Sequence, residues 1–148
     1  MRSMRQRLAD VVVIGLIILA LLGAAAPDYY RYRDIRASRD LLRQLNDAEQ
    51  EYQAANPHLG YACTLDDLAD AGLLSPKLSE GVTESYIVYL NCRGRRRLGP
   101  HTSYWLHLTP KYADRPYLCS DESGVVASDR WNLKACFDAL QAQRSPAP

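Results

Sequence analysis

The feature that most constrains the fold is an apolar run, VVVIGLIILALLGAAA, at residues 11–26, directly followed by Pro27. Its sixteen residues carry no charge, side-chain amide or hydroxyl. As a helix the run rises about 24 Å, a little less than the ~30 Å hydrocarbon core of a bilayer, and snorkelling of Arg5 and Arg7 would help it to span. The run therefore predicts a transmembrane helix over residues 11–27, preceded by a basic cytoplasmic leader over residues 1–10.

A secretory signal peptide is the competing interpretation of the same segment. Such a peptide has a basic start, an apolar middle and a small-residue exit, and the sequence supplies all three, with Gly23-Ala24-Ala25-Ala26 as the exit. Against it, Pro27 suits a cleavage site poorly, and the sequence beyond it is helical in pattern. We expect a retained single-pass anchor, with the residues from Asp28 onward exported.

Residues 28–56 are predicted to form the exported half of the same helix. They contain no glycine or proline, and residues at steps of three or four form one apolar stripe: Ile35, Ser38, Leu42, Leu45, Ala48, Tyr52 and Ala55. The opposite face is charged and is expected to be solvated. The helix ends at Asn56, because Pro57 disfavours the α conformation in the residue before it.

Residues 57–140 predict a connector followed by a small antiparallel sheet. In the connector, Thr64 is placed to cap a short helix and Gly72 to end it. Alternating apolar residues predict strands over 85–92 and 103–108, joined by a long polar tip, and a further strand from Tyr117. A short helix follows, and the polar, proline-rich residues 141–148 predict a disordered tail. These elements define an α+β fold in which the long helix packs on the sheet.

Four cysteines lie in the exported part, too far apart for the close pairs of a zinc ribbon: Cys63, Cys92, Cys119 and Cys136. An even number outside the cytoplasm indicates two disulfides, each worth roughly 3 to 4 kcal/mol in the chain-entropy model. The spacing leaves all three connectivities open. No metal site is predicted.

No catalytic constellation or cofactor motif can be assembled from the sequence. His101 and His107 have no partner at the spacing of a nucleophile, and motifs such as GxSxG and HExxH are absent. The predicted hairpin tip is a candidate anion-binding loop, with a solvated turn as the alternative, and its basic residues are Arg93, Arg95, Arg96 and Arg97. The formal net charge of +1 indicates no nucleic-acid partner. The chain is therefore not expected to be an enzyme.

The sequence resembles the type IV pilins and the pseudopilins of type II secretion. The similarity lies in the apolar run ending in a proline, the stretch YYRYRD at 29–34, and the order of helix, connector and antiparallel sheet. The strings GYACTLDDL at 60–68 and YLCSDESGVV at 117–126 are similar to strings in pilin-like proteins. Because each string carries one cysteine, the resemblance favours pairing Cys63 with Cys119, which leaves Cys92 with Cys136.

The resemblance also points to residues of the leader. In the family a leader peptidase cuts after a glycine, and a glutamate a few residues later pairs with the amino terminus of a neighbouring subunit. Counting back from Pro27 places Arg5 and Gln6 at the cleavage pair and Asp10 at the assembly carboxylate. Asp10 is therefore a candidate for subunit pairing. The alternatives are that Asp10 pairs with an arginine of its own chain or that it lies among lipid headgroups.

The resemblance implies a non-enzymatic, membrane-anchored subunit of a type IV pilus or a type II secretion-like filament. Its partners would be membrane lipid and other pilin-like subunits. Its location would be the bacterial inner membrane, with the amino terminus cytoplasmic and the folded domain in the periplasm or in an extracellular filament. The alternative function is an exported binding or accessory domain that does not polymerise.

Overall fold

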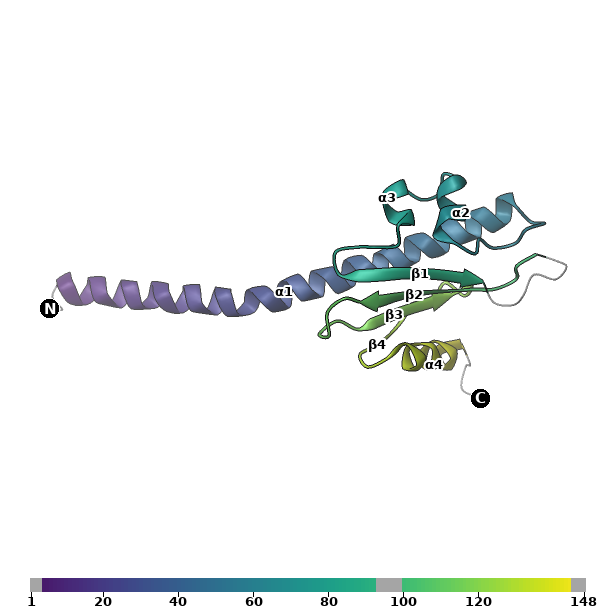
Figure 1. Ribbon diagram of the computed structural model, residues 1–148. Helices are drawn as coiled ribbons and strands as arrows, with labels where there is room; N and C mark the ends of the chain where they lie inside the picture. Colours follow the sequence, from purple (N-terminus) through teal and green to yellow (C-terminus); the bar gives the residue numbers. More distant parts are fainter. Residues whose placement is uncertain (1–3, 93–99, 145–148) are drawn as a thin grey trace. The chain divides into compact units, whose positions relative to one another are not determined.

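The computed structural model describes residues 4–92 and 100–144 (Figure 1). In chain order the elements are α1 (Met4–Ala55), α2 (Leu65–Asp70), α3 (Pro76–Ser79), β1 (Tyr86–Cys92), β2 (Tyr104–Pro110), β3 (Tyr117–Asp121), β4 (Ala127–Asp129) and α4 (Leu133–Arg144). The chain divides into two compact units, Met1–Asp34 and Ile35–Pro148. Because α1 contributes to both, each unit is described by itself.

The first unit consists of the amino-terminal part of α1, and it corrects the predicted membrane span. Among the described residues, no helix combines the length and the apolarity needed to cross a bilayer. The apolar run has only sixteen residues and is bounded by Asp10 and by Pro27, which Asp28 follows, so it is short for a ~30 Å hydrocarbon core. The transmembrane assignment of residues 11–27, the membrane-spanning half in the predicted fold class, and the single-pass inner-membrane location are therefore wrong.

The second unit is built on a four-stranded antiparallel sheet in the order β1-β2-β3-β4 (Figure 1). The register pairs Leu90 of β1 with Leu106 of β2, and Leu106 with Ser120 of β3. Side chains alternate between the two faces of each strand, and the burial follows that period: Tyr86, Val88 and Leu90 are buried, whereas Tyr89 is exposed. The predicted strands at 85–92 and 103–108 are thereby confirmed.

The α1 residues from 35 onward cover one face of the sheet. Leu42, Leu45 and Ala48 are buried against Leu106 and Leu108 of the central strand, in one core cluster that α2 and the connector complete. This burial confirms the apolar stripe predicted along the helix at those positions. Two polar residues next to them in the sequence, Asn46 and Glu49, are buried as well, and their burial was not predicted.

Helix α4 packs against the opposite face of β3 and β4 (Figure 1). Its residues 141–144 are helical, which corrects the predicted disordered tail over that range, since Arg144 pairs with Asp121 and Glu122 at 3.0 and 2.9 Å. Residues 145–148 of that prediction lie outside the described residues.

The two disulfides join Cys63 to Cys92 and Cys119 to Cys136. Two disulfides were predicted and are present, but the predicted pairing of Cys63 with Cys119 and of Cys92 with Cys136 is wrong. The physical reason is that the cysteines point to different faces of the sheet. Cys92 shares its face of the sheet with Leu90, toward the α1 core, whereas Cys119 follows Leu118 and faces α4. A bond from Cys63 to Cys119 would have to pass through the sheet.

Candidate functional site

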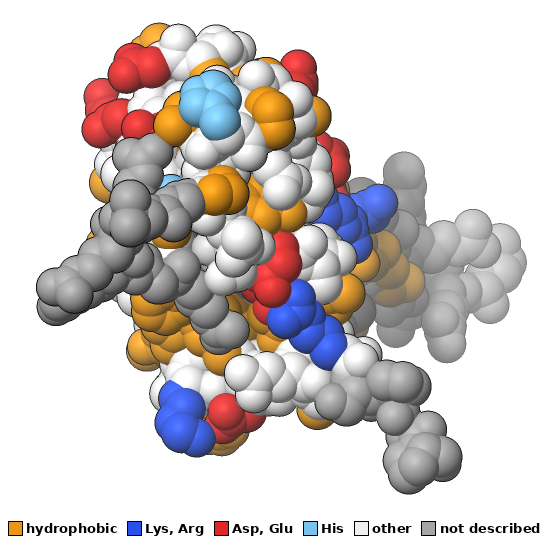
Figure 2. Space-filling view, turned by 90° about the vertical axis from the view of Figure 1, so that its right-hand side faces the viewer, with side chains coloured by type: hydrophobic (Ala, Val, Ile, Leu, Met, Phe, Trp, Pro, Cys, Tyr) orange, Lys and Arg blue, Asp and Glu red, His pale blue; other side chains and the backbone are white. Residues whose placement is uncertain are grey.

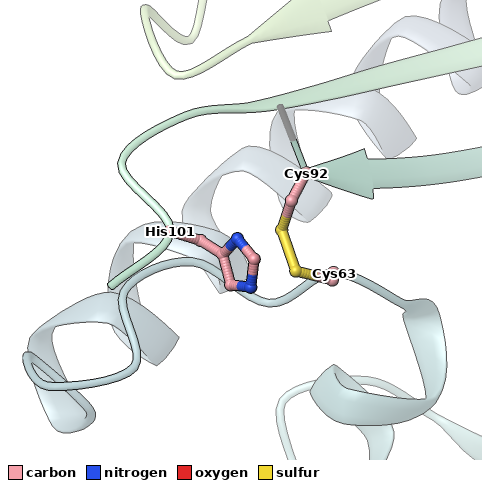
Figure 3. Close-up of side chains that lie close together, drawn as sticks. All are labelled: Cys63, Cys92 and His101. Carbon is pink, nitrogen blue, oxygen red and sulfur yellow. A yellow bond between two sulfur atoms is a disulfide. The ribbon is translucent and has the colours of Figure 1, made fainter. Parts of the chain in front are cut away.

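The imidazole of His101 lies beside the Cys63–Cys92 disulfide, as Figure 3 shows. One ligand-type atom from each residue, a sulfur or an imidazole nitrogen, lies within 4.8 Å of the other two, and all three residues are half-buried. They come from three separate places: the connector before α2, the end of β1 and the segment before β2. We call this group the cystine–histidine cluster.

The backbone fixes the position of His101 against the connector. The His101 N–H donates to Leu59 O at 2.8 Å, and the Tyr61 N–H donates to His101 O at 3.0 Å, which makes a parallel bridge between Gly60 and His101. Gly60 has φ +80°, and a β-carbon there would lie 2.1 Å from His101 O. Only glycine permits this close approach of the two segments.

Replacing Gly60 with alanine is therefore expected to lower the free energy of unfolding by about 2 to 5 kcal/mol, as the sum of left-handed strain and overpacking. Gly72→Ala is the matched control, because Gly72 has φ +73° but open space around its β position. Its cost should be the strain alone, about 1 to 2 kcal/mol. Urea unfolding of both variants measures the difference, and equal losses would contradict the steric account.

Cys63 is held by the amino-terminal cap of α2. The Thr64 hydroxyl accepts from Asp67 N–H at 3.1 Å, and the Asp67 carboxylate accepts from the N–H groups of Cys63 and Thr64 at 3.2 and 3.0 Å. This capping box confirms the predicted role of Thr64. Beside the cluster lies a pocket of about 180 Å³, which is large enough for several waters. It is lined by Tyr52, Leu59, Tyr61, Ala62, Cys63, Asp67 and His101.

Glu49 is a fully buried carboxyl group on α1, under the same connector. Its Oε2 accepts from Ala62 N–H at 2.9 Å, and among the described residues its Oε1 has no hydrogen-bond partner. The pKa of Glu49 is raised to about 8, chiefly by burial, against the lowering effect of the hydrogen bond from Ala62 and with a smaller contribution from the Asp67 charge. Glu49 therefore takes up a proton at a pH where ordinary carboxyl groups are ionised.

A chain of hydrogen bonds between buried side chains joins α1 to the sheet. The Tyr104 hydroxyl donates to Asn46 Oδ1 at 3.0 Å, Asn46 Nδ2 donates to Ser120 Oγ at 2.7 Å, and Ser120 Oγ donates to Val125 O at 2.7 Å. Burial, and the nearby Glu49 carboxyl, raise the pKa of the Tyr104 phenol. The chain of bonds accounts for a buried asparagine without a charge partner.

The outer face of the sheet carries His107, which is buried by its aromatic neighbours. Its ring stacks on Tyr89 with the centroids 4.7 Å apart and lies 5.8 Å from the ring of Trp105. Burial lowers the pKa of His107, so the ring is neutral near pH 7. His107, for which the sequence indicated no partner, therefore has a packing role.

The large aliphatic side chains of the first unit whose exposure is described are exposed along α1. Their exposed fractions lie between 52% and 73%, and the residues are Val12, Val13, Ile14, Leu16, Ile17, Ile18 and Leu19. We call them the apolar α1 surface. Residues three and four apart share a face of a helix, so seven positions within an eight-residue stretch point to all sides.

The predicted leader and loop residues are placed only in part. Arg5, Gln6 and Asp10 belong to α1, but their side chains are outside the described part of the structure, so the cleavage and assembly roles stay predictions. The candidate anion-binding loop, Arg93, Arg95, Arg96 and Arg97, lies outside the described residues altogether. On the described part of the face seen in Figure 2, acidic and basic side chains are interspersed with apolar ones.

Sequence reasoning missed the cystine–histidine cluster and Glu49. His101 lies 38 residues from Cys63 in the chain and 9 from Cys92, so no short motif joins them. Position 49 does follow Leu42 and Leu45 at helical spacing, and that signal could have marked it as buried. The comparisons with known proteins add no relative, since no family model, curated protein or solved structure gives a significant match to this chain.

Proposed function

We propose that this chain is a non-enzymatic structural subunit of a pilin-like filament and that it assembles through the amino-terminal part of α1. The observation that supports the proposal is the apolar α1 surface, whose side chains are each more than half exposed. Contiguous apolar surface of this kind on a folded chain marks an interaction site.

The distribution of the apolar residues favours many neighbours over one. A helix that is apolar on every side is covered on every side when it is stable in water, and a single partner helix would leave one flank exposed. Burying the exposed part of each of these side chains contributes about 1 kcal/mol of binding free energy. The apolar α1 surface as a whole therefore supplies several kcal/mol for each subunit. A bundle of copies, in which several α1 helices surround each one, meets this requirement.

The second unit has the features of a domain that is stable without that assembly. It has its own core around Leu45 and Leu106, with two disulfides attached to it. The residues of that core all belong to the second unit. The combination of one apolar assembly helix and one independently packed domain also accords with the resemblance to pilins.

The experiment is assembly of the purified full chain, followed by light scattering and negative-stain electron microscopy. The chain is expected to form elongated particles, and Ile17→Asp should raise the critical concentration at least about 100-fold, since an unpaired carboxylate in an apolar interface costs several kcal/mol. Ala37→Asp is the control, because Ala37 is an exposed α1 residue in the second unit, and it should assemble like the parent.

Two outcomes would contradict this function. One is a chain that stays monomeric at high concentration, which would favour an accessory or binding domain that does not polymerise. The other is an Ile17→Asp variant that assembles as readily as Ala37→Asp, which would place the contacts elsewhere on the chain.

A further inference from the structure

We propose that Cys63, Cys92 and His101 form a binding site for a zinc-class divalent cation when the Cys63–Cys92 disulfide is reduced. Two thiolates and one imidazole are ligands that Zn²⁺ prefers, and three protein ligands with one open position are a recurrent zinc arrangement. The site is independent of the assembly proposed above, because all three residues lie in the second unit.

The geometry of the oxidised form is close to that of such a site. The three ligand-type atoms already lie within 4.8 Å of one another. Around a tetrahedral zinc, with Zn–S of about 2.3 Å and Zn–N of about 2.0 Å, ligand atoms are about 3.5 to 3.8 Å apart. Reduction frees the two sulfurs to separate by rotation about their side-chain bonds, while the imidazole closes the remaining gap.

The backbone holds the three residues in place without the disulfide. His101 is tied to the connector by its two backbone hydrogen bonds, across from Gly60. The N–H of Cys63 is held by the Asp67 carboxylate, and Cys92 ends β1 opposite Tyr104 of β2. Loss of the sulfur–sulfur bond therefore leaves the ligands near one another, which limits the ordering that metal binding must supply.

The adjacent pocket provides the fourth position. Its volume of about 180 Å³ borders both Cys63 and His101, so a water can reach a metal held there. The second disulfide has no comparable neighbour, because the cystine–histidine cluster is the one group of three or more such ligands found among the described residues.

The redox step balances with a phosphine reductant. The phosphine and one water give the phosphine oxide, and the sulfur–sulfur bond takes up two electrons and two protons to become two thiols. Zinc then replaces the thiol protons, which are released to the buffer. In the oxidised form neither sulfur is a thiolate, which is the form of cysteine that binds a metal, so the disulfide switches the site off.

The test uses the full chain, reduced without oxygen by a phosphine that is then removed. Zinc is titrated against a chromophoric chelator, and Co²⁺ is added separately to read the thiolate-to-cobalt charge-transfer band. The reduced chain is expected to bind one Zn²⁺ and to show the band, and the oxidised chain should do neither. The double variant Cys119→Ser, Cys136→Ser should still bind, whereas Cys63→Ser, Cys92→Ser should not.

His101→Ala should weaken zinc binding at least about 10-fold, the loss typical of removing even an outer partner of a metal site. His58→Ala is the matched control, because His58 is an exposed histidine of the connector, and its affinity should equal that of the parent. If reduction loosens the domain, zinc should restore its far-ultraviolet circular dichroism. Absence of zinc uptake by the reduced chain, no such recovery, or equal affinities for the two histidine variants would overturn the proposal.

Discussion

Glu49→Gln is expected to remove most of the pH dependence of unfolding between about pH 4.5 and pH 8 and to stabilise the protein at alkaline pH. Glu49 is fully buried, and its pKa rises from 4.5 to about 8 on folding. A group with such a shift makes the folded state bind more protons than the unfolded state between those two values. The stability that this shift contributes is therefore fully present below about pH 4.5 and is lost as the pH rises toward 8.

The size of the effect follows from the same linkage. The pKa rise corresponds to roughly 5 kcal/mol between the two ends of this pH range. The glutamine amide oxygen can still accept the hydrogen bond from Ala62, so the variant should match the parent within about 1 kcal/mol near pH 4. Near pH 9 it should be more stable than the parent by several kcal/mol.

Urea unfolding at a series of pH values, followed by near-ultraviolet circular dichroism of the aromatic core, measures this dependence. Glu51→Gln is the control, since Glu51 is exposed on the same helix, and it should keep the slope of the parent. A Glu49→Gln variant that retains the parent's slope would show that Glu49 is ionised in the folded protein at neutral pH.

The sheet was predictable because one of its faces is buried. Alternation at Tyr86, Val88 and Leu90 fixes which side chains point to the core, and a slip of one residue would expose them all. The capping residue Thr64 was readable for a similar reason, because its partner Asp67 lies three residues away. Both signals are local in sequence.

The features that escaped prediction depend on contacts distant in sequence. The partner of Glu49 is the backbone of Ala62, thirteen residues further on, and the burial of Glu49 exists only once the connector folds over α1. The disulfide pairing depended on which face of the sheet each β3 side chain points to. Leu118 faces the α1 core, so Cys119 points toward α4. Family-like strings around the cysteines carry no information on which face a cysteine points to.

The apolar run illustrates a different limit. Composition alone made residues 11–26 a membrane candidate, because each leucine, isoleucine or valine favours insertion. The deciding quantities are the length of the run and the charges that flank it, since Asp10 on one side and Pro27 with Asp28 on the other confine the run to sixteen residues. The same side chains are instead a large exposed surface in this structure, and the proposed assembly rests on that property.

Leu45→Ala is expected to lower the free energy of unfolding by about 3 to 5 kcal/mol. Leu45 is 0% exposed and lies in the core that α1 forms with the sheet, and removing a buried leucine side chain costs its transfer energy plus a cavity that the rigid sheet cannot close. Leu41→Ala on the same helix is the matched control, because Leu41 is only partly buried against that core. Its loss should be about half as large or less. Alanine keeps the helix propensity in both variants, so the difference reports packing of α1 on the sheet. Urea unfolding that gave equal losses would mean that α1 is not seated on the sheet through Leu45.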